Sequence, residues 1–324
     1  MRYIVMGAGA IGGVIGARLH QAGEDVVLIA RGRQLHALQS SGLTLKDELG
    51  HTSLSIRCVG APSDITWRSD DVTLLTVKSQ DTSAALSDLG AAASPDMPLI
   101  CAQNGVSNER QALRLFARVY GACVNCPADN PRAGGVATMT VPTGMLDIGR
   151  FPQGRDAFSD DLVGTLRRAT FDAQAVDDVM ARKYSKLLLN LANAARITCR
   201  DEPSVHDVIQ LAIAEGKACL EAADISYVPP EEALEVRRAR LRPHGERDEE
   251  AHPDWRLRQE RTWASEADHL NGEIVLLGRE HGVATPINAA LQALARRVAH
   301  GAGPGLASAT DILSGVQHDR AHRH

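Results

Sequence analysis

A glycine-rich turn near the start of the printed sequence constrains the fold more than any other stretch. Residues 3–6 form a short apolar segment that predicts a strand, and residues 14–19 continue with the apolar spacing of a helix. Between them lies Gly-Ala-Gly-Ala-Ile-Gly, the Gly-x-Gly-x-x-Gly arrangement of a dinucleotide-binding turn. There the first glycine permits the tight bend, the second lets the backbone approach a pyrophosphate, and the third allows the helix to pack on the strand. The alternative is an ordinary strand–helix turn that binds nothing. The candidate cofactor-binding residues are Gly7, Ala8, Gly9, Ala10, Ile11 and Gly12.

The second predicted strand indicates which dinucleotide would bind. Residues 24–30 are largely apolar and are followed by Arg31 and, two positions later, Arg33. Sites for NAD usually carry Asp or Glu at the end of this strand, where the carboxylate accepts a hydrogen bond from the ribose 2′-hydroxyl. The strand here ends without an acid, and a guanidinium group matches phosphate oxygens in a bidentate manner. We therefore expect Arg31, and Arg33 beside it, to bind the 2′-phosphate of NADP(H). The alternative is a solvated loop arginine.

Composition argues against several other classes of protein. The 324 residues suggest two domains, and 44% hydrophobic with 23% charged residues are ordinary for a globular protein. A net charge of −5 and only 3% aromatic residues argue against a nucleic-acid partner. The sequence has no apolar run long enough to span a membrane and opens with a strand rather than a signal peptide, so we expect a cytoplasmic location. Cys123 and Cys126 form a Cys-x-x-Cys within a predicted strand, and we interpret them as structural, reduced thiols.

The order of the predicted elements divides the chain into an α/β half and an all-α half. Residues 71–77 and 98–102 are apolar on both faces, as strands of a parallel sheet must be. We therefore expect the α/β fold class, with a Rossmann-type NADP-binding domain over residues 1–172, an all-α substrate and catalytic domain over 173–300, and a disordered tail over 301–324. Further expected elements are helices at 33–41 and 83–92, strands at 43–45, 54–59, 118–126, 135–142 and 144–149, and helices at 181–196, 204–223, 231–241 and 262–281.

Two polar residues follow the central predicted strands. Lys78 and Asn104 come just after largely apolar runs, past the carboxyl ends of strands. Open α/β sheets bind ligands at this edge. Both residues are therefore candidates to line a cofactor, and a solvated turn residue is an equally good interpretation from position alone.

The first helix of the second half carries the best candidate for an acid–base group. Lys186, Asn190 and Asn193 fall within about 60° on one helix face, beside leucines that can pack elsewhere. A lysine with two amides on a leucine-rich helix is costly unless that face meets water, a ligand or a partner; an exposed polar stripe is the alternative. Glu266 projects with the buried stripe of the helix at 262–281. A carboxylate there needs a cation or a hydrogen-bond donor, for which Lys186 is the first choice. The alternative is a glutamate in the first turn of the helix that interacts favourably with the helix dipole.

Together these motifs resemble the ketopantoate reductase (2-dehydropantoate 2-reductase) family, part of the 6-phosphogluconate dehydrogenase-like group. The resemblance covers residues 1 to about 295. It implies an NADP-dependent oxidoreductase that reduces a 2-oxo acid, 2-dehydropantoate, to pantoate in pantothenate biosynthesis. The motifs that carry it are the glycine turn, Arg31, Val77-Lys78-Ser79, Gln103-Asn104-Gly105-Val106, Lys186 with Asn190, and the stretches 266–272 and 278–288.

The resemblance also implies roles for individual residues. Lys186 would be the general acid that protonates the developing alkoxide, and Glu266 would orient Lys186 or the nicotinamide ribose. Lys78 and Asn104 would line the nicotinamide and ribose side, and Asn190 would bind the substrate hydroxyl or carboxylate. The chemistry agrees, because an ammonium group both stabilises negative charge on oxygen and delivers a proton. We expect no metal, since hydride transfer from a nicotinamide needs none, and a monomer or homodimer.

Two positions depart from the family pattern. Ala194 stands where the family often has a second asparagine, and Asn193 next to it is the candidate to substitute. Asp254 stands where the family usually has a serine that binds the substrate carboxylate, and an aspartate facing a carboxylate is repulsive. Asn193 and Asp254 remain the further substrate-binding candidates. A different branched or bulky 2-oxo acid is the first alternative to ketopantoate, and a catalytically silent NADP(H)-binding sensor is the second.

Overall fold

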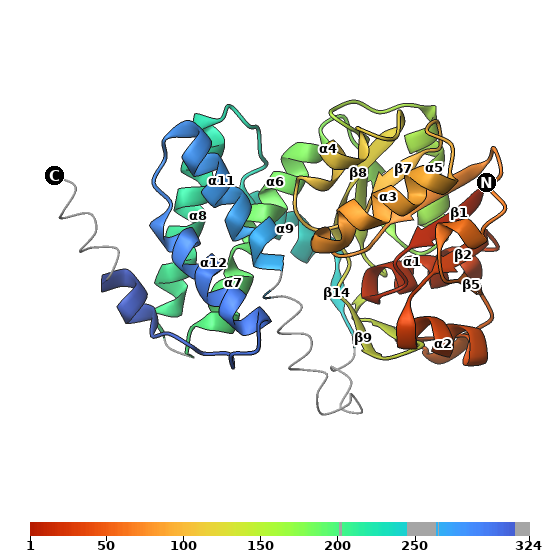
Figure 1. Cartoon of the computed structure of the whole chain (residues 1–324), viewed down its shortest axis with the longest axis horizontal. Coiled ribbons are helices and arrows are strands. Elements are labelled where there is room, and N and C mark those ends of the chain that lie inside the picture. The colour runs from red at the N-terminus through yellow and green to blue at the C-terminus, as the bar shows by residue number, and fades with distance from the viewer. Residues whose placement is uncertain (201–202, 245–263, 265, 315–324) are drawn as a thin grey trace. The chain divides into compact units, whose positions relative to one another are not determined.

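The computed structural model describes residues 1–200, 203–244, 264 and 266–314 (Figure 1). The chain divides into two compact units. The first contains Met1–Lys183 and the segment that starts at Glu231; the second contains Tyr184–Pro230 and the described residues after 263. Each helix in the described part of the chain is too short or too polar to cross a membrane.

An eight-stranded sheet forms the centre of the first unit. In spatial order its strands are β13 (Asp172–Ala175), β12 (Met145–Arg150), β8 (Val119–Asn125), β7 (Leu99–Cys101), β6 (Asp71–Leu75), β1 (Arg2–Met6), β2 (Asp25–Ile29) and β5 (Arg57–Val59). The strands from β8 to β5 run parallel, and in chain order they give the arrangement 3-2-1-4-5-6 of a doubly wound dinucleotide-binding fold. β12 runs antiparallel to β8. The predicted α/β fold class is thus confirmed.

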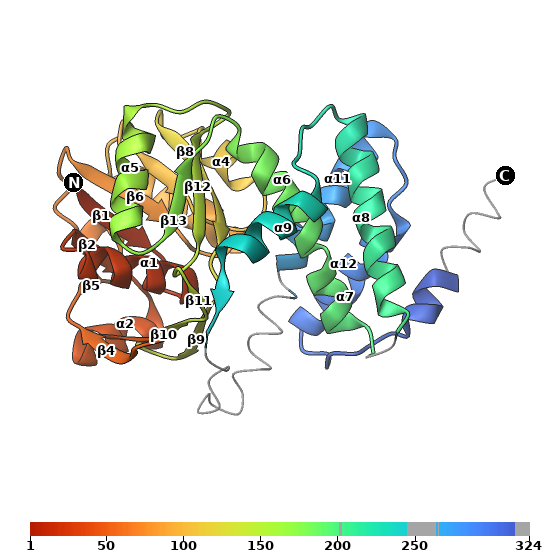
Figure 2. The same cartoon turned by 180° about the vertical axis from the view of Figure 1, so that it is seen from behind.

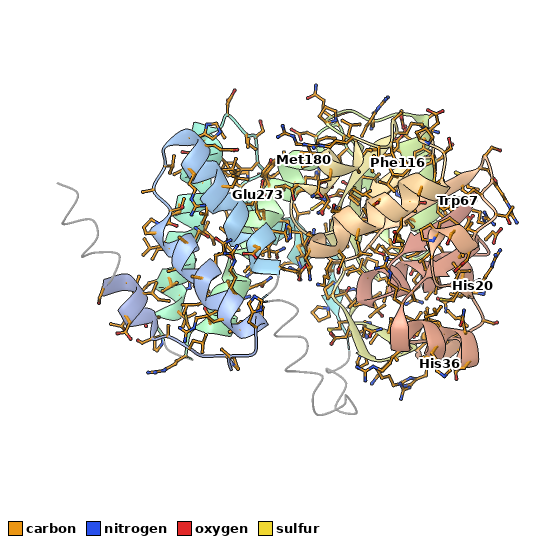
Figure 3. All side chains as sticks on the ribbon, viewed as in Figure 1. His20, His36, Trp67, Phe116, Met180 and Glu273 are labelled. Atoms are coloured by element: carbon orange, nitrogen blue, oxygen red, sulfur yellow. The ribbon has the colours of Figure 1, made fainter. Side chains whose placement is uncertain are left out.

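Helices cover both faces of this sheet. They include α1 (Ala10–Gln21), α2 (Gly32–Ser41), α3 (Thr82–Ala92), α4 (Asn108–Ala112) and α5 (Ala157–Arg168). Side chains alternate along a strand, so Tyr3 and Val5 of β1 pack with α1 and α5, whereas Ile4 and Met6 pack with α3. Figure 1 shows α3 in front of the sheet, and Figure 2 shows α5 on the opposite face. Phe116, labelled in Figure 3, belongs to the cluster on the α3 face.

Two smaller sheets complete the first unit. The four-stranded one contains, in order, β4 (Gly50–Leu54), β3 (Leu43–Asp47), β10 (Gly135–Thr138) and β9 (Ala128–Arg132). It packs against α1 at Gly13, where a Cβ would lie 2.7 Å from Val136 Cγ1. The other pairs β11 (Thr140–Val141) with β14 (Arg242–Pro243), which ties the segment carrying α9 (Pro230–Arg240) to this unit.

The second unit is helical. α6 (Val179–Asn190) begins in the first unit and ends in the second, which continues with α7 (Ala192–Thr198), α8 (Val205–Ala222), η3 (Ala267–His269), α11 (Asn271–His281) and α12 (Pro286–Ala299). α8 packs against α6 at Gly216, where a Cβ would lie 2.5 Å from Leu188 Cδ2. The buried carboxylate of Glu215 accepts hydrogen bonds from the backbone nitrogens of Ile287 and Asn288, both at 2.9 Å, and so satisfies the first amides of α12.

The structure corrects the limits of several predicted elements. The strand predicted at 54–59 is wrong, because β4 ends at Leu54 and β5 begins at Arg57 in a different sheet. The helix predicted at 181–196 is interrupted by a turn at Leu191, and the one predicted at 262–281 is interrupted by η3, after which α11 begins. Apolar periodicity continues through each break, and sequence pattern alone therefore does not reveal it.

The domain limits also differ from those expected. β13 still pairs in the large sheet, so the sheet continues past the boundary expected at 172. Its sequence, Asp-Ala-Gln-Ala, lacks an apolar run because it is an edge strand. Residues 301–314, expected to be disordered, contain a β-bridge from Ala307 to Cys199 and a helix at 309–314 with Ile312 buried. The rest of the expected tail, 315–324, lies outside the described residues.

Candidate functional site

The glycine turn joins β1 to α1 and leaves very little space around two of its glycines. Gly7 adopts φ +110°, and a Cβ there would lie 2.9 Å from the backbone nitrogen of Val77. A Cβ on Gly12 would lie 2.2 Å from the carbonyl oxygen of Gly7 and 2.4 Å from Thr76 Oγ1. Gly9 differs, because a Cβ there would meet no atom within 4 Å. The fold itself therefore requires Gly7 and Gly12, whereas Gly9 borders open space at the start of α1.

This open space fits the pyrophosphate of a dinucleotide. The first N–H groups of a helix have no partner within the helix, and the helix dipole favours an anion at that end. The first turn of α1 contains no acidic residue that would repel a phosphate. The chemistry of the turn thus agrees with the predicted cofactor role of residues 7–12.

Arg31 stands between β2 and α2, at the position predicted from the sequence. Its guanidinium is exposed and forms an ion pair with Asp88 of α3, with 2.7 Å between Nη2 and Oδ2. Arg33, two residues further on, is exposed as well. A phosphate could reach Arg31 from solvent, but it would compete with the carboxylate of Asp88.

Gln34 of α2 contacts the glycine turn and was missed in the sequence analysis. Its Nε2 donates to the carbonyl oxygen of Ala8 at 2.7 Å, and its Oε1 accepts from the backbone nitrogen of Gly134 at 2.9 Å. The side chain therefore connects the turn to the loop between β9 and β10. A glutamine in the first turn of a helix carries no local signal for such a contact.

The segments that carry Lys78 and Asn104 lie side by side at the carboxyl ends of β6 and β7. Both side chains are half-buried. Ser79 Oγ donates to the carbonyl oxygen of Asn104 at 3.0 Å, and Gln103 Nε2 donates to the carbonyl oxygen of Val77 at 2.8 Å. These bonds join the ends of the two strands that precede Lys78 and Asn104. They lie next to the switch point of the sheet, where the chain continues from β1 toward β2 on one side and from β6 toward β7 on the other.

A buried ion pair lies next to these strand ends, and the sequence analysis missed it. Lys183 of α6, 3% exposed at its side chain, pairs with Glu109 of α4, 0% exposed. The ammonium also donates to the carbonyl oxygen of Gln103 at 3.2 Å. One signal could have revealed Lys183: it lies four residues after Val179 and four before Leu187, both buried, and so falls on the apolar stripe of its helix.

The predicted acid–base residues belong to the second unit. Lys186 and Asn190 are half-buried and lie one turn apart on α6. Asn193 is also half-buried but belongs to α7, because the turn at Leu191 separates the two helices. Glu266 is buried, as its place on the apolar stripe predicted; it is helical and directly precedes η3, which separates it from α11. Pairing of Glu266 with Lys186 stays a prediction.

The remaining candidates add little to the site. Asp254 lies outside the described residues, and Ala194 is buried on α7. Cys123 and Cys126 are buried, and their thiols donate to the carbonyl oxygens of Arg182 and Thr143, as structural thiols do. Within the described ranges, no group of three or more His, Cys, Asp or Glu side chains is placed to hold a metal ion.

Two family models match most of the chain. The model described as "Ketopantoate reductase PanE/ApbA" matches residues 3–153, and the one described as "Ketopantoate reductase PanE/ApbA C terminal" matches residues 178–299. A 2-dehydropantoate 2-reductase of Archaeoglobus fulgidus is 30% identical over 310 residues, which cover 93% of this chain and 98% of that protein.

Solved structures resemble the fold over nearly the whole chain. A PanE/ApbA family ketopantoate reductase from Ralstonia eutropha JMP134 has a TM-score of 0.76 at 26% identity, covering 93% of this chain and 99% of its own. A D-mandelate dehydrogenase, determined with NADH and anilino(oxo)acetate, has a TM-score of 0.76 at 20% identity with the same coverage, which is a likeness of fold alone.

Proposed function

Because the chain belongs to the ketopantoate reductase PanE/ApbA family, we propose that it reduces 2-dehydropantoate to pantoate with NADPH, a step of pantothenate biosynthesis. Membership makes it an oxidoreductase that acts on C=O or CH–OH groups with a dinucleotide cofactor. The observation that carries the choice of substrate is the 30% identity to the Archaeoglobus fulgidus enzyme across 93% of this chain. A cytoplasmic location and a monomeric or homodimeric state stay predictions.

We assign the cofactor to the carboxyl edge of the large sheet. The glycine turn would hold the pyrophosphate at the start of α1, and Arg31 would hold the 2′-phosphate that distinguishes NADPH from NADH. Lys78 and Asn104, whose segments are hydrogen-bonded to one another through Ser79, would line the nicotinamide side. The open space at Gly9 and the exposed guanidinium of Arg31 support this assignment.

We assign the acid–base chemistry to α6. When bound, the cofactor supplies a hydride to the carbonyl carbon of the 2-oxo acid. Lys186 would stabilise the negative charge that grows on the carbonyl oxygen and donate the proton that completes the alcohol. Asn190 and Asn193 would bind the substrate hydroxyl or carboxylate. Glu266, a buried carboxylate that needs a cation or donor, would orient Lys186 or the nicotinamide ribose.

The second candidate function keeps the reaction and changes the acid. Ala194, buried on α7, replaces an asparagine common in the family, and Asp254 replaces a serine. The D-mandelate dehydrogenase of the same fold was determined with anilino(oxo)acetate, a 2-oxo acid with a bulky substituent. A 2-oxo acid with a different substituent is therefore the alternative substrate class.

The test is NADPH oxidation, followed by absorbance, with ketopantoate beside a panel of other 2-oxo acids and with NADH as the control cofactor. We expect turnover with ketopantoate and NADPH. Lys186→Ala should lose about 10²–10⁴-fold in kcat while still binding NADPH. Lys217→Ala, a half-buried lysine of α8, is the matched control and should keep its activity. Turnover with another acid alone would favour the second candidate, and tight NADPH binding without turnover of any acid would favour the sensor.

A further inference from the structure

The ion pair of Lys183 and Glu109 is buried deeply enough that its charges need an explanation. Their side chains are 3% and 0% exposed. Taking a lysine and a glutamate out of water is expensive, and apolar side chains of similar volume often leave a protein equally or more stable. A contribution to stability is therefore a weak explanation for why this pair is buried.

The surroundings of the pair are not fully satisfied either. In the part of the chain that the structure describes, Glu109 Oε2 and Gln103 Oε1 are buried without a hydrogen-bond partner. A cluster that served only to stabilise the fold would be expected to satisfy such atoms, since each costs free energy when left unpaired. Stability alone therefore does not account for this arrangement of polar groups.

What the pair holds is the segment between β7 and α4. Lys183 Nζ donates to the carbonyl oxygen of Gln103, the residue before Asn104. The side chain of Gln103 continues the connection, because its Nε2 donates to the carbonyl oxygen of Val77, the residue before Lys78. One buried ammonium group thus fixes the backbone next to both residues assigned to the nicotinamide side.

Lys183 also belongs to the helix that carries Lys186. The two residues are three positions apart on α6, a rise of about 4.5 Å. Lys183 is the last residue of the first unit along this helix. Its bonds to Glu109 and Gln103 therefore anchor α6 one turn before the proposed general acid.

We propose that Lys183 and Glu109 are positioning residues for the reduction: they fix the Gln103–Asn104 segment and the start of α6 in the geometry that hydride and proton transfer require. This inference rests on the proposed function. Reaction rates respond strongly to small errors in such geometry, whereas binding of the adenine and pyrophosphate parts does not depend on it. Loss of the pair should therefore lower kcat far more than it weakens NADPH binding.

The test is the double variant Lys183→Met/Glu109→Leu, which removes both charges together and leaves none uncompensated. The matched control is Arg2→Met/Asp71→Leu. This pair is equally buried, with 2.7 Å between Arg2 Nε and Asp71 Oδ1, but it lies at the amino ends of β1 and β6, away from the proposed cofactor site. We expect the first double variant to keep its NADPH Kd within about threefold and to lose about tenfold or more in kcat. The control should keep the kcat of the wild type.

A kinetic isotope effect separates positioning from general damage. The measurement uses NADPH deuterated at the transferred hydrogen. If the donor and acceptor carbons are mispositioned, hydride transfer becomes the rate-limiting step. The isotope effect on kcat should therefore rise in Lys183→Met/Glu109→Leu and stay at the wild-type value in the control. Should this double variant fail to fold, Lys183→Gln/Glu109→Gln also removes both charges but keeps polar side chains, and it should show the same rise with a smaller loss.

The outcomes separate the two levels of the argument. A double variant with wild-type kcat and isotope effect, in an enzyme that reduces a 2-oxo acid, would overturn the positioning role and leave the proposed function intact. If the wild-type protein fails to oxidise NADPH in the presence of any of the 2-oxo acids, the proposed function is overturned, and the positioning role with it.

Discussion

Alanine in place of Gly9 should weaken cofactor binding without harming the fold. Gly9 precedes α1 with φ −83° and ψ −155°, an extended conformation open to alanine, and the added Cβ would meet no atom within 4 Å. Replacing glycine at a compatible position gains about 0.4–1 kcal/mol by restricting the unfolded chain. Alanine is a poorer N-cap residue than glycine, by an amount of similar size. We therefore expect the free energy of unfolding to change by less than about 1 kcal/mol.

Gly12→Ala is the informative contrast within the same turn. Its Cβ would lie 2.2 Å from the carbonyl oxygen of Gly7 and 2.4 Å from Thr76 Oγ1, far inside van der Waals contact. Such overpacking costs about 1–3 kcal/mol or more, since the backbone of the turn itself must move. At about 2–4 °C per kcal/mol, the melting temperature should fall by several degrees.

The assay is NADPH titration by fluorescence together with thermal unfolding of the nucleotide-free protein. We expect Gly9→Ala to weaken NADPH binding by about tenfold or more, about 1.4 kcal/mol, because the methyl group occupies the space into which the pyrophosphate must come. Gly90→Ala in α3, where a Cβ would make ordinary contact with Leu115 Cδ1 at 3.6 Å, is the control for a helix glycine elsewhere. Unchanged NADPH affinity in a stable Gly9→Ala protein would refute the reasoning, since the pyrophosphate would then not approach this turn.

Three further predictions concern single side chains. Arg31→Ala should raise the KM for NADPH and leave the KM for NADH unchanged. Asp88→Asn should lower the KM for NADPH, because it removes the carboxylate that competes with the 2′-phosphate for Arg31. Equal changes in the KM values for NADPH and NADH would contradict a 2′-phosphate site at Arg31. Burial raises the pKa of Asp147 above its usual 3.8 despite Arg182, so its contribution to stability is greatest below pH 3.8 and is lost as pH rises through the folded pKa. Urea titrations from pH 3 to 7 should therefore show Asp147→Asn gaining stability relative to the wild type as pH rises. Burial also raises the pKa of Cys58 to about 11, so alkylation of this thiol by iodoacetamide at pH 8 should be slow and should accelerate toward pH 11.

Local sequence was enough to predict the features that local chemistry determines. The glycine turn, the strand before it and the arginine after the second strand each depend on a few neighbouring residues. The structure places the turn and the arginine at the carboxyl ends of two neighbouring parallel strands, β1 and β2. The parallel strands at 71–77 and 98–102 were predictable as well, because burial on both faces leaves a continuous apolar run.

Features that depend on distant residues were not predictable in this way. Glu109 and Lys183 are 74 positions apart, and although the apolar stripe of α6 predicts that Lys183 is buried, no local pattern identifies Glu109 as its partner. Residues 54–59 alternate in the same manner whether they form one strand or two, and their division depends on which strands lie beside them: β3 pairs with β4, and β2 pairs with β5. Pairing partners are decided by packing of the whole unit rather than by the segment itself.

Two buried ion pairs of the first unit show how the ends of one sheet differ. At the amino ends of β1 and β6, Arg2 forms a bidentate pair with Asp71, whose Oδ2 also accepts from the backbone nitrogen of Arg68 at 2.7 Å, and the pair raises the pKa of Arg2. Near the carboxyl end of β7, one buried oxygen of Glu109 has no hydrogen-bond partner among the residues that the structure describes. The satisfied pair lies at the amino edge of the sheet, and the partly satisfied pair lies near the carboxyl edge, where doubly wound sheets bind their ligands. This difference is why we expect substitution of the first pair to affect mainly stability, and of the second mainly turnover.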